Sequence, residues 1–498
     1  MSTTLAPAAV ELDDIQGLVR FAYKNHTEAV FLLLRITDRA AARAWLGRAA
    51  LTDAVTREPP PSTALQVALT SEGLRALGVA ADIIGAFSVE FVEGMAADSS
   101  RSRRLGDEGA GDPSRWRWGS GERVPHAAVL LYALPGQLQG WQETIEAQLR
   151  EGFEITQRLA THRGSTEPFG FADGLSQPEV DWNRRRPVAD ATQYAYLNLS
   201  CLGEYLLGYP NEYGLYTPRP LLEPARDTQR VLPRAEEAPG SCDLGRNGSY
   251  LVIRQLRQDL SGFWQALDRY AGGDPRAREE LASALVGRRL DGQPLMAPAS
   301  AAAPGSDAQP SLNAFDYRSD PQGLTCPLGA HIRRANPRTA DLPPGGAGVV
   351  SRLLRILGLN RAAREQDLVA STRFHRLLRR GRKYGVDVTP EQALTGTGAA
   401  DCGLHFVCLG ANIQRQFEFV QSAWLMSAKF DGLRAESDPL LGNRLPVAPG
   451  MPTDGFSLPQ AGGPGRCLAG LPQFVTVVGG AYFFLPGIRA LRFLAGAR

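Results

Sequence analysis

Histidines are rare in this 498-residue chain, which contains six of them. His331 stands in residues 326–338 (CPLGAHIRRANPR), after two small residues and before Arg333, Arg334 and Arg338. Small neighbours allow a flat ring system to approach the imidazole, and an imidazole nitrogen is a usual ligand of haem iron. The arginines could pair with carboxylates of such a ligand in bidentate fashion. Taken alone, the pattern more often belongs to a hydrogen-bonded structural histidine.

A second candidate is Asp173, which lies between two glycines in residues 170–174 (GFADG). Glycines on both sides of an acid permit sharp turns of the backbone and close approach of a flat ligand. A carboxylate at such a turn can take a proton from one atom of a reacting group and return it to another. The common alternative is an aspartate that only stabilises a turn.

The third candidate segment is basic. Residues 373–385 (RFHRLLRRGRKYG) place Arg379 shortly before a glycine turn, and the wider stretch 352–383 holds ten Arg or Lys against two acids. Such a stretch is either a solvated face or a source of positive charge for an anionic ligand. The composition of the stretch favours neither interpretation over the other.

The spacing of Cys402, His405 and Cys408 is that of a possible metal site, but the surrounding apolar run predicts a β-strand. Successive side chains of a strand point to opposite faces, so both cysteines would share a face with Leu404 and Phe406 while His405 points away. We therefore favour buried thiols over a metal site. The six cysteines of the chain show no framework spacing, which indicates reduced thiols.

The composition argues against several classes of protein. The chain has 54 Lys and Arg against 52 Asp and Glu, a net charge of +2, so it lacks the basic excess expected of a nucleic-acid-binding protein. It has no apolar run of roughly 18 residues that would span a membrane, and residues 1–14 do not have the pattern of a signal peptide. With its reduced thiols, the chain is expected to be cytoplasmic.

The elements that would carry the candidate residues repeat one succession twice. Apolar runs predict the strands, and apolar residues three or four positions apart predict the helices. In the first half we expect strands at 15–21, 29–36, 64–70, 126–133 and 153–160, and helices at 39–46, 71–78 and 138–149. In the second half we expect strands at 250–256, 404–409 and 474–485, and helices at 260–270 and 414–424. The predicted fold class is α+β, with two ferredoxin-like (β-α-β-β-α-β) units built on antiparallel sheets.

We place the N-terminal unit at residues 1–190 and the C-terminal unit at 191–498. Residues 297–310 (APASAAAPGSDAQP) and 341–348 (DLPPGGAG) contain few core-forming side chains and are expected to be loop insertions in the second unit. If two such units bring their sheets together, a cavity remains between sheet and helices.

Taken together and in this order, the segments resemble the dye-decolourising peroxidase family over most of the chain. The opening 15–20 (IQGLVR), the GFADG motif, the His331 segment and the Arg379 segment follow one another as in that family. Residues 411–421 (ANIQRQFEFVQ) and 438–442 (DPLLG) are similar to its long, bacterial-type members. Each motif is weak alone, but four in sequence are specific.

The resemblance implies a haem-dependent peroxidase that reduces hydrogen peroxide and oxidises small organic reductants, such as dyes and phenolics, by one-electron steps. It implies haem b in the C-terminal unit, with His331 on the iron, Asp173 as the distal acid and base, and Arg379 as the distal arginine. It further implies that Arg338 meets a haem propionate and that two residues roof the distal pocket, namely Leu404 and Phe406.

The family often has a further acid behind the iron-binding histidine. Glu418, on the helix expected at 414–424, is our candidate for that acid. Asn412 stands where some relatives carry an aspartate, which leaves the identity of the acid open.

Other interpretations of the same residues are possible. A haem-binding or haem-processing protein on this fold, without peroxidase turnover, would keep His331 but lack the pair of Asp173 and Arg379. A scaffold without haem would use all three motifs as turns. Trp116 and Trp118, in a polar loop, are either core residues or a relay for electrons from the surface. The sequence does not indicate the oligomeric state.

Overall fold

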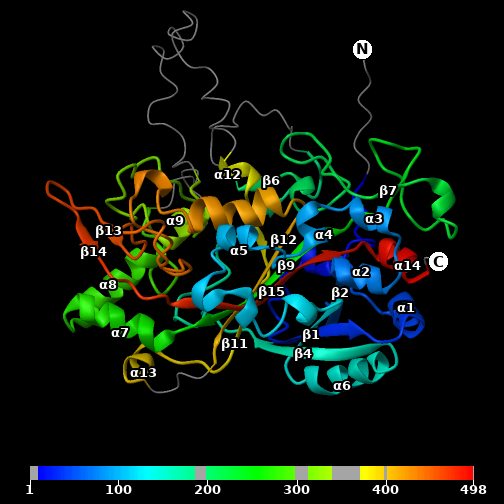
Figure 1. Ribbon diagram of the computed structural model, residues 1–498, viewed down its shortest axis with the longest axis horizontal. Helices are drawn as coiled ribbons and strands as arrows, with labels where there is room; N and C mark the ends of the chain where they lie inside the picture. Colours follow the sequence, from blue (N-terminus) through cyan, green and yellow to red (C-terminus); the bar gives the residue numbers. More distant parts are fainter. Residues whose placement is uncertain (1–8, 186–197, 298–311, 339–370, 397–400, 497–498) are drawn as a thin grey trace, which may run out of the picture.

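The computed structural model describes residues 9–185, 198–297, 312–338, 371–396 and 401–496. The elements of the first half gather on the right of Figure 1, and the helices α7 (Leu260–Ala271), α8 (Pro275–Val286) and α13 (Pro390–Leu394) lie at the left. No helix in the described part of the chain has the length and apolar character that crossing a bilayer requires.

The first half forms one ferredoxin-like unit. Its four strands are antiparallel and lie in the order β4-β1-β3-β2, which is the order of a β-α-β-β-α-β unit. The unit consists of β1 (Glu28–Ile36), α1 (Arg39–Arg48), β2 (Thr63–Leu69), β3 (Ala127–Ala133), α6 (Leu138–Leu149) and β4 (Phe153–His162). All of these had been predicted, with ends that differ by at most a few residues.

The second half repeats the arrangement with longer insertions. Its main strands lie in the order β15-β9-β12-β11, again antiparallel. Two π-helical segments, η7 (Gln414–Glu418) and η8 (Val420–Leu425), stand where one α-helix was expected. The strands are β9 (Ser249–Gln258), β10 (Leu378–Arg379), β11 (Arg382–Tyr384), β12 (Gly403–Gly410) and β15 (Val475–Leu485).

The two units form one continuous nine-stranded sheet. Between the units, β15 pairs with β2 only at Phe484 and Leu69, and β11 pairs with β4 only at Lys383 and His162. Because β12 pairs with both β9 and β11, the sheet closes on itself. Alternate side chains of both units therefore pack inside the closed sheet, and the opposite faces of the strands pack against helices. The prediction of an α+β fold with two ferredoxin-like units is confirmed.

Residues 15–21 do not form the expected strand. They contain a short 3-10 helix, η1 (Gly17–Val19). The buried amide of Gln16 donates to the carbonyl oxygen of Val67 and accepts from its N–H, both at 2.8 Å. A side chain thus makes the contacts with β2 that a neighbouring strand would have made, which explains why an apolar segment beside the sheet is not part of it.

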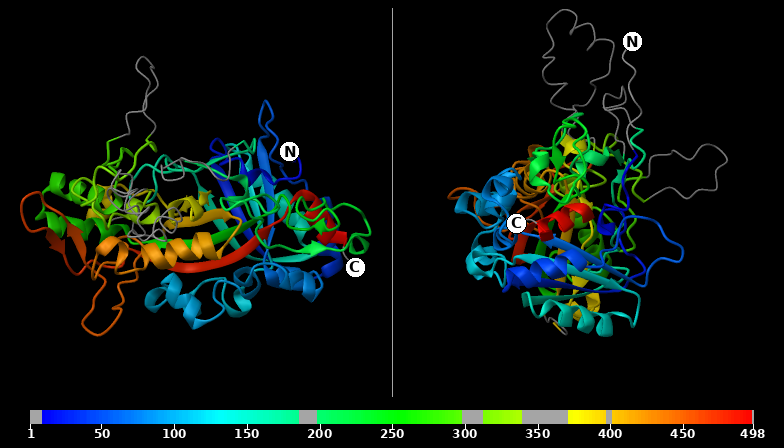
Figure 2. Two further views of the ribbon diagram at one scale, coloured as in Figure 1. Left: turned by 90° about the horizontal axis from the view of Figure 1, so that it is seen from above. Right: turned by 90° about the vertical axis from the view of Figure 1, so that its right-hand side faces the viewer.

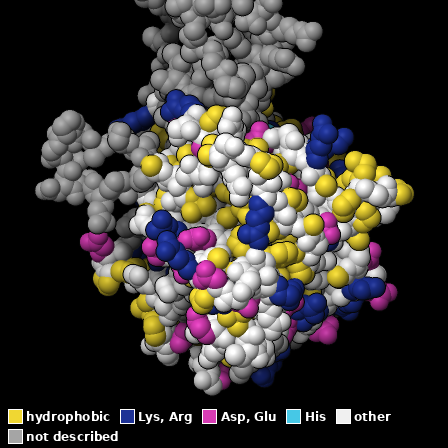
Figure 3. All heavy atoms as spheres, turned by 90° about the vertical axis from the view of Figure 1, so that its left-hand side faces the viewer, with side chains coloured by type: hydrophobic (Ala, Val, Ile, Leu, Met, Phe, Trp, Pro, Cys, Tyr) yellow, Lys and Arg dark blue, Asp and Glu magenta, His cyan; other side chains and the backbone are white. Residues whose placement is uncertain are grey.

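The boundary proposed at residue 190 lies in 186–197, outside the described residues, so the division into 1–190 and 191–498 stays a prediction. The insertion expected at 341–348 also lies outside them, as does that at 297–310 apart from its first residue. On the face shown in Figure 3, basic and acidic side chains are interspersed, as a net charge of +2 leads one to expect.

Candidate active site

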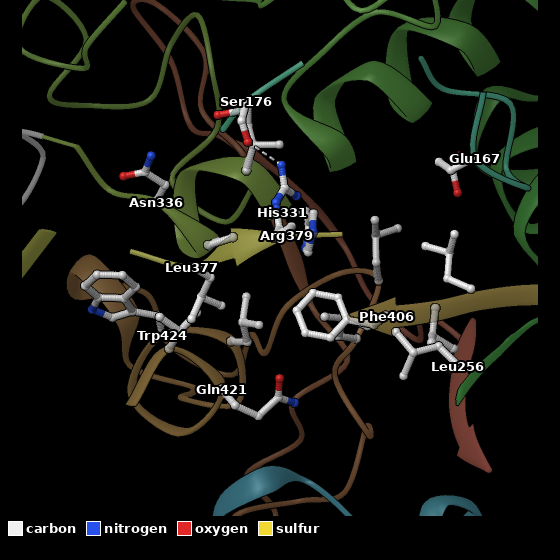
Figure 4. A pocket seen from close by; sticks show the side chains of 18 of the residues that line it. Glu167, Ser176, Leu256, His331, Asn336, Leu377, Arg379, Phe406, Gln421 and Trp424 are labelled. Carbon is white, nitrogen blue, oxygen red and sulfur yellow. Dashed lines mark hydrogen bonds between the residues drawn. The ribbon is translucent and has the colours of Figure 1, made fainter. Parts of the chain in front are cut away.

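A cavity of about 300 Å³ lies beside the outer face of β9 and β12. In the pairing of β9 with β12, Arg254 lies opposite Phe406 and Leu256 lies opposite Leu404. These four side chains therefore share one face of the sheet, and that face lines the cavity. Across from the strands lie the short helix α9 (His331–Ala335) and η8. Figure 4 shows side chains from these elements directed into the cavity. His331, Asp173, Arg379, Arg338, Leu404 and Phe406 all line it.

The imidazole of His331 is oriented by a buried aspartate. Its Nδ1 donates to Oδ2 of Asp438 at 3.0 Å, and Asp438 is fully buried. The other carboxylate oxygen accepts from the N–H groups of Leu440 and Leu441, which fixes the carboxylate in its loop. The second ring nitrogen of His331, Nε2, has no hydrogen-bond partner in the described residues and is left to the cavity. A carboxylate behind an imidazole fixes its tautomer and makes its free nitrogen a better metal ligand.

Electrostatics keep this aspartate ionised. Burial alone would raise the pKa of Asp438, but the attraction and hydrogen bond of His331, the charge of Arg334 and the N–H of Leu441 outweigh burial and lower the pKa below its ordinary value. The negative charge behind His331 is therefore present over the whole working pH range of an ordinary enzyme.

The prediction that Glu418 stands behind the histidine is wrong. Glu418 lies on η7 and faces β15, where its carboxylate accepts from the hydroxyl of Tyr482 at 2.9 Å and lies 3.3 Å from Nε of Arg101. Asn412 instead accepts from the N–H of Arg415 at the start of the π-helical segment. The sequence signal for the true partner was the DPLLG string at 438–442, but its pairing with His331 spans 107 residues.

The loop that carries Asp173 depends on its glycines. Gly170 and Gly174 have φ of +102° and +75°, values that favour glycine over other residues. Asp173 is exposed beside the cavity, and its Oδ1 accepts from the N–H of Gly174 at 2.6 Å. The backbone N–H of Asp173 donates to Ser165, which holds the loop closed.

Arg379 reaches the cavity because of its strand register. In β10 it pairs with Cys408 of β12, on the face that Phe406 also uses. Its Nη2 donates to the carbonyl oxygen of Ser176 at 2.6 Å, drawn as a dashed line in Figure 4, and its backbone N–H donates to Oε1 of Gln177. Sequence reasoning missed both partners, which follow Asp173 in the same loop and so connect the two functional side chains.

The arginines after His331 have different roles. Arg334 donates to the carbonyl oxygens of Trp424 and Glu436, and Arg333 pairs with Asp320, so both are anchors of α9 and not partners for a ligand. This corrects the expectation that the whole arginine cluster faces the ligand. Arg338 does line the cavity, and its guanidinium donates to the carbonyl oxygens of residues 313 and 315.

Other sequence hypotheses are settled by burial. Cys402 and Cys408 are buried, and the ring of His405 points to the opposite side, where it stacks on Tyr384 at 4.5 Å. Both thiols are thus buried, as the strand pattern predicted, and within the described ranges no group of three His, Cys, Asp or Glu residues is placed to hold a metal ion. The side chains of Trp116 and Trp118 are 0% and 1% exposed and belong to the core.

Comparisons with known proteins agree with this geometry. No protein-family model matches the chain. A multifunctional dye peroxidase from an Amycolatopsis species is 29% identical over 99% of both chains, and a dye-decolourising peroxidase of Mycetinis scorodonius is 28% identical over 97% of this chain and 88% of its own. These similarities over nearly the full length of the chain support the resemblance to dye-decolourising peroxidases.

Solved structures show the same fold. An ancestral D-type dye-decolourising peroxidase superimposes with a TM-score of 0.72 at 25% identity, over 97% of this chain and 99% of its own. A dye-decolourising peroxidase in complex with 2,6-dimethoxyphenol gives a TM-score of 0.71 at 23% identity, over 98% of this chain and all of its own.

Replacing Asp438 tests the orientation of His331. Asp438→Asn keeps an oxygen that can accept from Nδ1 but removes the negative charge, and loss of such a partner typically weakens ligand binding by about 10- to 100-fold. We expect that loss in a titration of the apoprotein with haem, followed by absorbance. Glu418→Gln is the matched control, because Glu418 is also a buried acid; equal losses in both variants would contradict the assignment.

Proposed function

We propose that the protein reduces hydrogen peroxide with haem b bound through His331, with Asp173 as acid and base and Arg379 as the source of stabilising positive charge. Relatives over nearly the whole chain are named dye peroxidases, and a solved structure of the same fold was in complex with 2,6-dimethoxyphenol, which supports a haem-dependent peroxidase that acts on dyes and phenolics. The observation that carries the assignment of residues is the hydrogen bond between His331 and Asp438. Nε2 of His331 is not used in that bond, and His331 lines the same cavity as Asp173 and Arg379.

The residues of the cavity fit haem. Nε2 of His331 has no hydrogen-bond partner among the described residues and is available to iron, and Arg338 offers a positive charge to a propionate. Leu404, Phe406 and other apolar side chains provide walls for a macrocycle. When bound, haem supplies the iron that exchanges electrons with peroxide and then with the reductant.

Asp173 moves the protons. Breaking the O–O bond of hydrogen peroxide so that water leaves requires a proton to pass from one peroxide oxygen to the other. A carboxylate that lines the cavity and is exposed to it can accept that proton and return it, and a positioned group of this kind contributes about 10²–10⁴-fold in rate.

Arg379 supplies charge and no proton. A guanidinium carries a permanent positive charge, which stabilises the negative charge that builds up as the O–O bond breaks. Its hydrogen bonds to Ser176 and Gln177 fix it in place beforehand, so little reorganisation is required during the reaction.

One experiment separates a peroxidase from a haem carrier on the same fold. The purified holoprotein is mixed with hydrogen peroxide and a phenolic reductant such as 2,6-dimethoxyphenol. We expect repeated turnover that depends on both compounds, with saturation in each. Bound haem without turnover would leave a haem-binding or haem-processing role, and a colourless protein that takes up no haem would exclude both.

A further inference from the structure

Glu167 is a second acid that lines the cavity, only six residues before Asp173. We propose that Glu167 is a positioning residue for Asp173, which fastens the loop carrying Asp173 to β9 and makes the peroxide reaction respond to pH through its own charge. This inference rests on the proposed function of the cavity.

The first hydrogen bond of the Glu167 carboxylate closes the turn that leads to Asp173. Oε1 of Glu167 accepts from the N–H of Phe171 at 3.1 Å. The backbone of Glu167 makes two further contacts in the same turn: its N–H donates to the carbonyl oxygen of Phe171 at 2.8 Å, and its carbonyl oxygen accepts from Gly170 at 2.9 Å. Residues 167–171 are thereby held as a unit, and Asp173 follows two residues later.

The second hydrogen bond of the carboxylate joins that turn to the sheet. Oε2 of Glu167 accepts from Nε2 of Gln258 at 3.0 Å. Gln258 ends β9, on the cavity face shared with Arg254 and Leu256. Figure 4 shows Glu167 and Leu256 on the same side of the cavity, away from Trp424. The contact therefore sets the position of the loop relative to the strand that forms the cavity wall.

The amide of Gln258 can form a hydrogen bond with Glu167 whether Glu167 is charged or neutral. Its amide oxygen, Oε1, is buried and has no hydrogen-bond partner in the described residues. An amide carries a donor and an acceptor, so Nε2 can donate to a carboxylate, and after a half-turn of the amide Oε1 can accept from a protonated carboxyl. The buried oxygen of Gln258 is therefore an acceptor that a protonated Glu167 can use.

The surroundings of Glu167 favour that proton. Burial raises the pKa of Glu167 to about 7, and the negative charge of Asp173 acts in the same direction, against hydrogen bonds from Gln258 and from the N–H groups of Phe169 and Phe171. Within the described ranges no lysine or arginine forms an ion pair with Glu167. Among the main influences on its pKa, Asp173 is the charged group, and the others are burial and hydrogen bonds from amide groups. Arg254, Arg288, Arg338 and Arg379 line the same cavity without forming an ion pair with Glu167.

The charge of Glu167 would act on the reaction by repulsion. Below about pH 7 the acid is neutral, and above it a second negative charge appears behind Asp173. That charge opposes the negative charge that builds up as the O–O bond breaks. The rate of the reaction with peroxide should therefore fall several-fold as pH rises through about 7, even where Asp173 and Arg379 are intact.

The test compares Glu167→Gln, Gln258→Leu and wild-type holoprotein. The rate of the reaction with hydrogen peroxide is measured by stopped flow on both sides of neutral pH. We expect Glu167→Gln to lose the inflection. Gln258→Leu should move it to higher pH, because the carboxylate loses a hydrogen bond that lowers its pKa. A merely structural role for Glu167 would lower the rate equally at every pH.

A second readout uses the apoprotein. The infrared band of protonated carboxyl groups should lose amplitude through about pH 7, and part of that change should be missing in Glu167→Gln. Glu204→Gln is the control. Burial also raises the pKa of Glu204 to about 7, but Glu204 does not line the cavity. In this variant the inflection in the rate of the peroxide reaction should therefore persist.

The outcomes distinguish the two proposals. If the wild-type holoprotein does not react with peroxide at any pH, the proposed function fails. If it reacts normally and Glu167→Gln keeps the same inflection, or Gln258→Leu leaves it unmoved, the inference about Glu167 fails alone.

Discussion

His331→Ala is expected to purify with little or no haem, because it removes the one cavity-facing nitrogen that Asp438 orients. The substitution also leaves a space beside Asp438 that free imidazole can fill. We therefore expect the absorbance spectrum of the variant to lack the normal Soret band, and added imidazole to restore haem binding in part. Haem content per protein is the measurement.

His375 provides the matched control for that result. It lines the same cavity, but its Nδ1 is bonded to the backbone of Arg415 and its ring stacks on Phe419 at 3.6 Å. Burial lowers the pKa of His375 to about 4. His375→Phe preserves the stack and should bind haem normally; loss of haem in this variant, with a normal spectrum in His331→Ala, would move the ligand to position 375.

Asp173→Ala is expected to slow the reaction with peroxide by about 10²–10⁴-fold while haem content stays normal. The side chain is exposed, and within the described residues its carboxylate has one partner, the neighbouring N–H of Gly174. Its removal therefore costs a proton acceptor and little packing. Stopped-flow measurement of the peroxide reaction, at several peroxide concentrations, gives the rate.

Asp291→Ala controls for the loss of an aspartate from a turn. Asp291 is also exposed and accepts from a nearby backbone N–H, that of Gln293, but it does not line the cavity. We expect its removal to leave the peroxide rate unchanged. If Asp173→Ala behaves in the same way, Asp173 is only a turn residue and Arg379 is the main catalytic group.

Local patterns predicted the strands and helices of the closed sheet well. Alternating or continuous apolar runs placed β1, β9, β12 and β15 to within a few residues. The same patterns could not reveal that residues 15–21 contact β2 through the amide of Gln16, because that contact is made by a polar side chain over 51 residues. Nor could they reveal the π-helical form of 414–425, which shares its apolar spacing with an α-helix.

In the site, short motifs identified several residues that line the cavity. They did not predict the roles of residues that depend on partners far away in the sequence. His331, Asp173 and Arg379 stand in recognisable strings. The acid behind His331 was misassigned, since nothing in the chain marks a pairing across 107 residues. In the sequence, Arg333 and Arg334 cannot be distinguished from arginines that bind a ligand. Only their tertiary contacts show that they support α9.

The order in which the chain is made has a consequence for the way this protein folds. The ring of strands is closed by β15, at residues Val475–Leu485, which pairs with β9 along its length and touches β2 of the first unit. Until those residues leave the ribosome, β9 and β2 present unpaired backbone edges, which are open to association with other chains. At that stage the cavity wall formed by β9 also lacks its neighbouring strand, so we expect haem to bind only after β15 has been made.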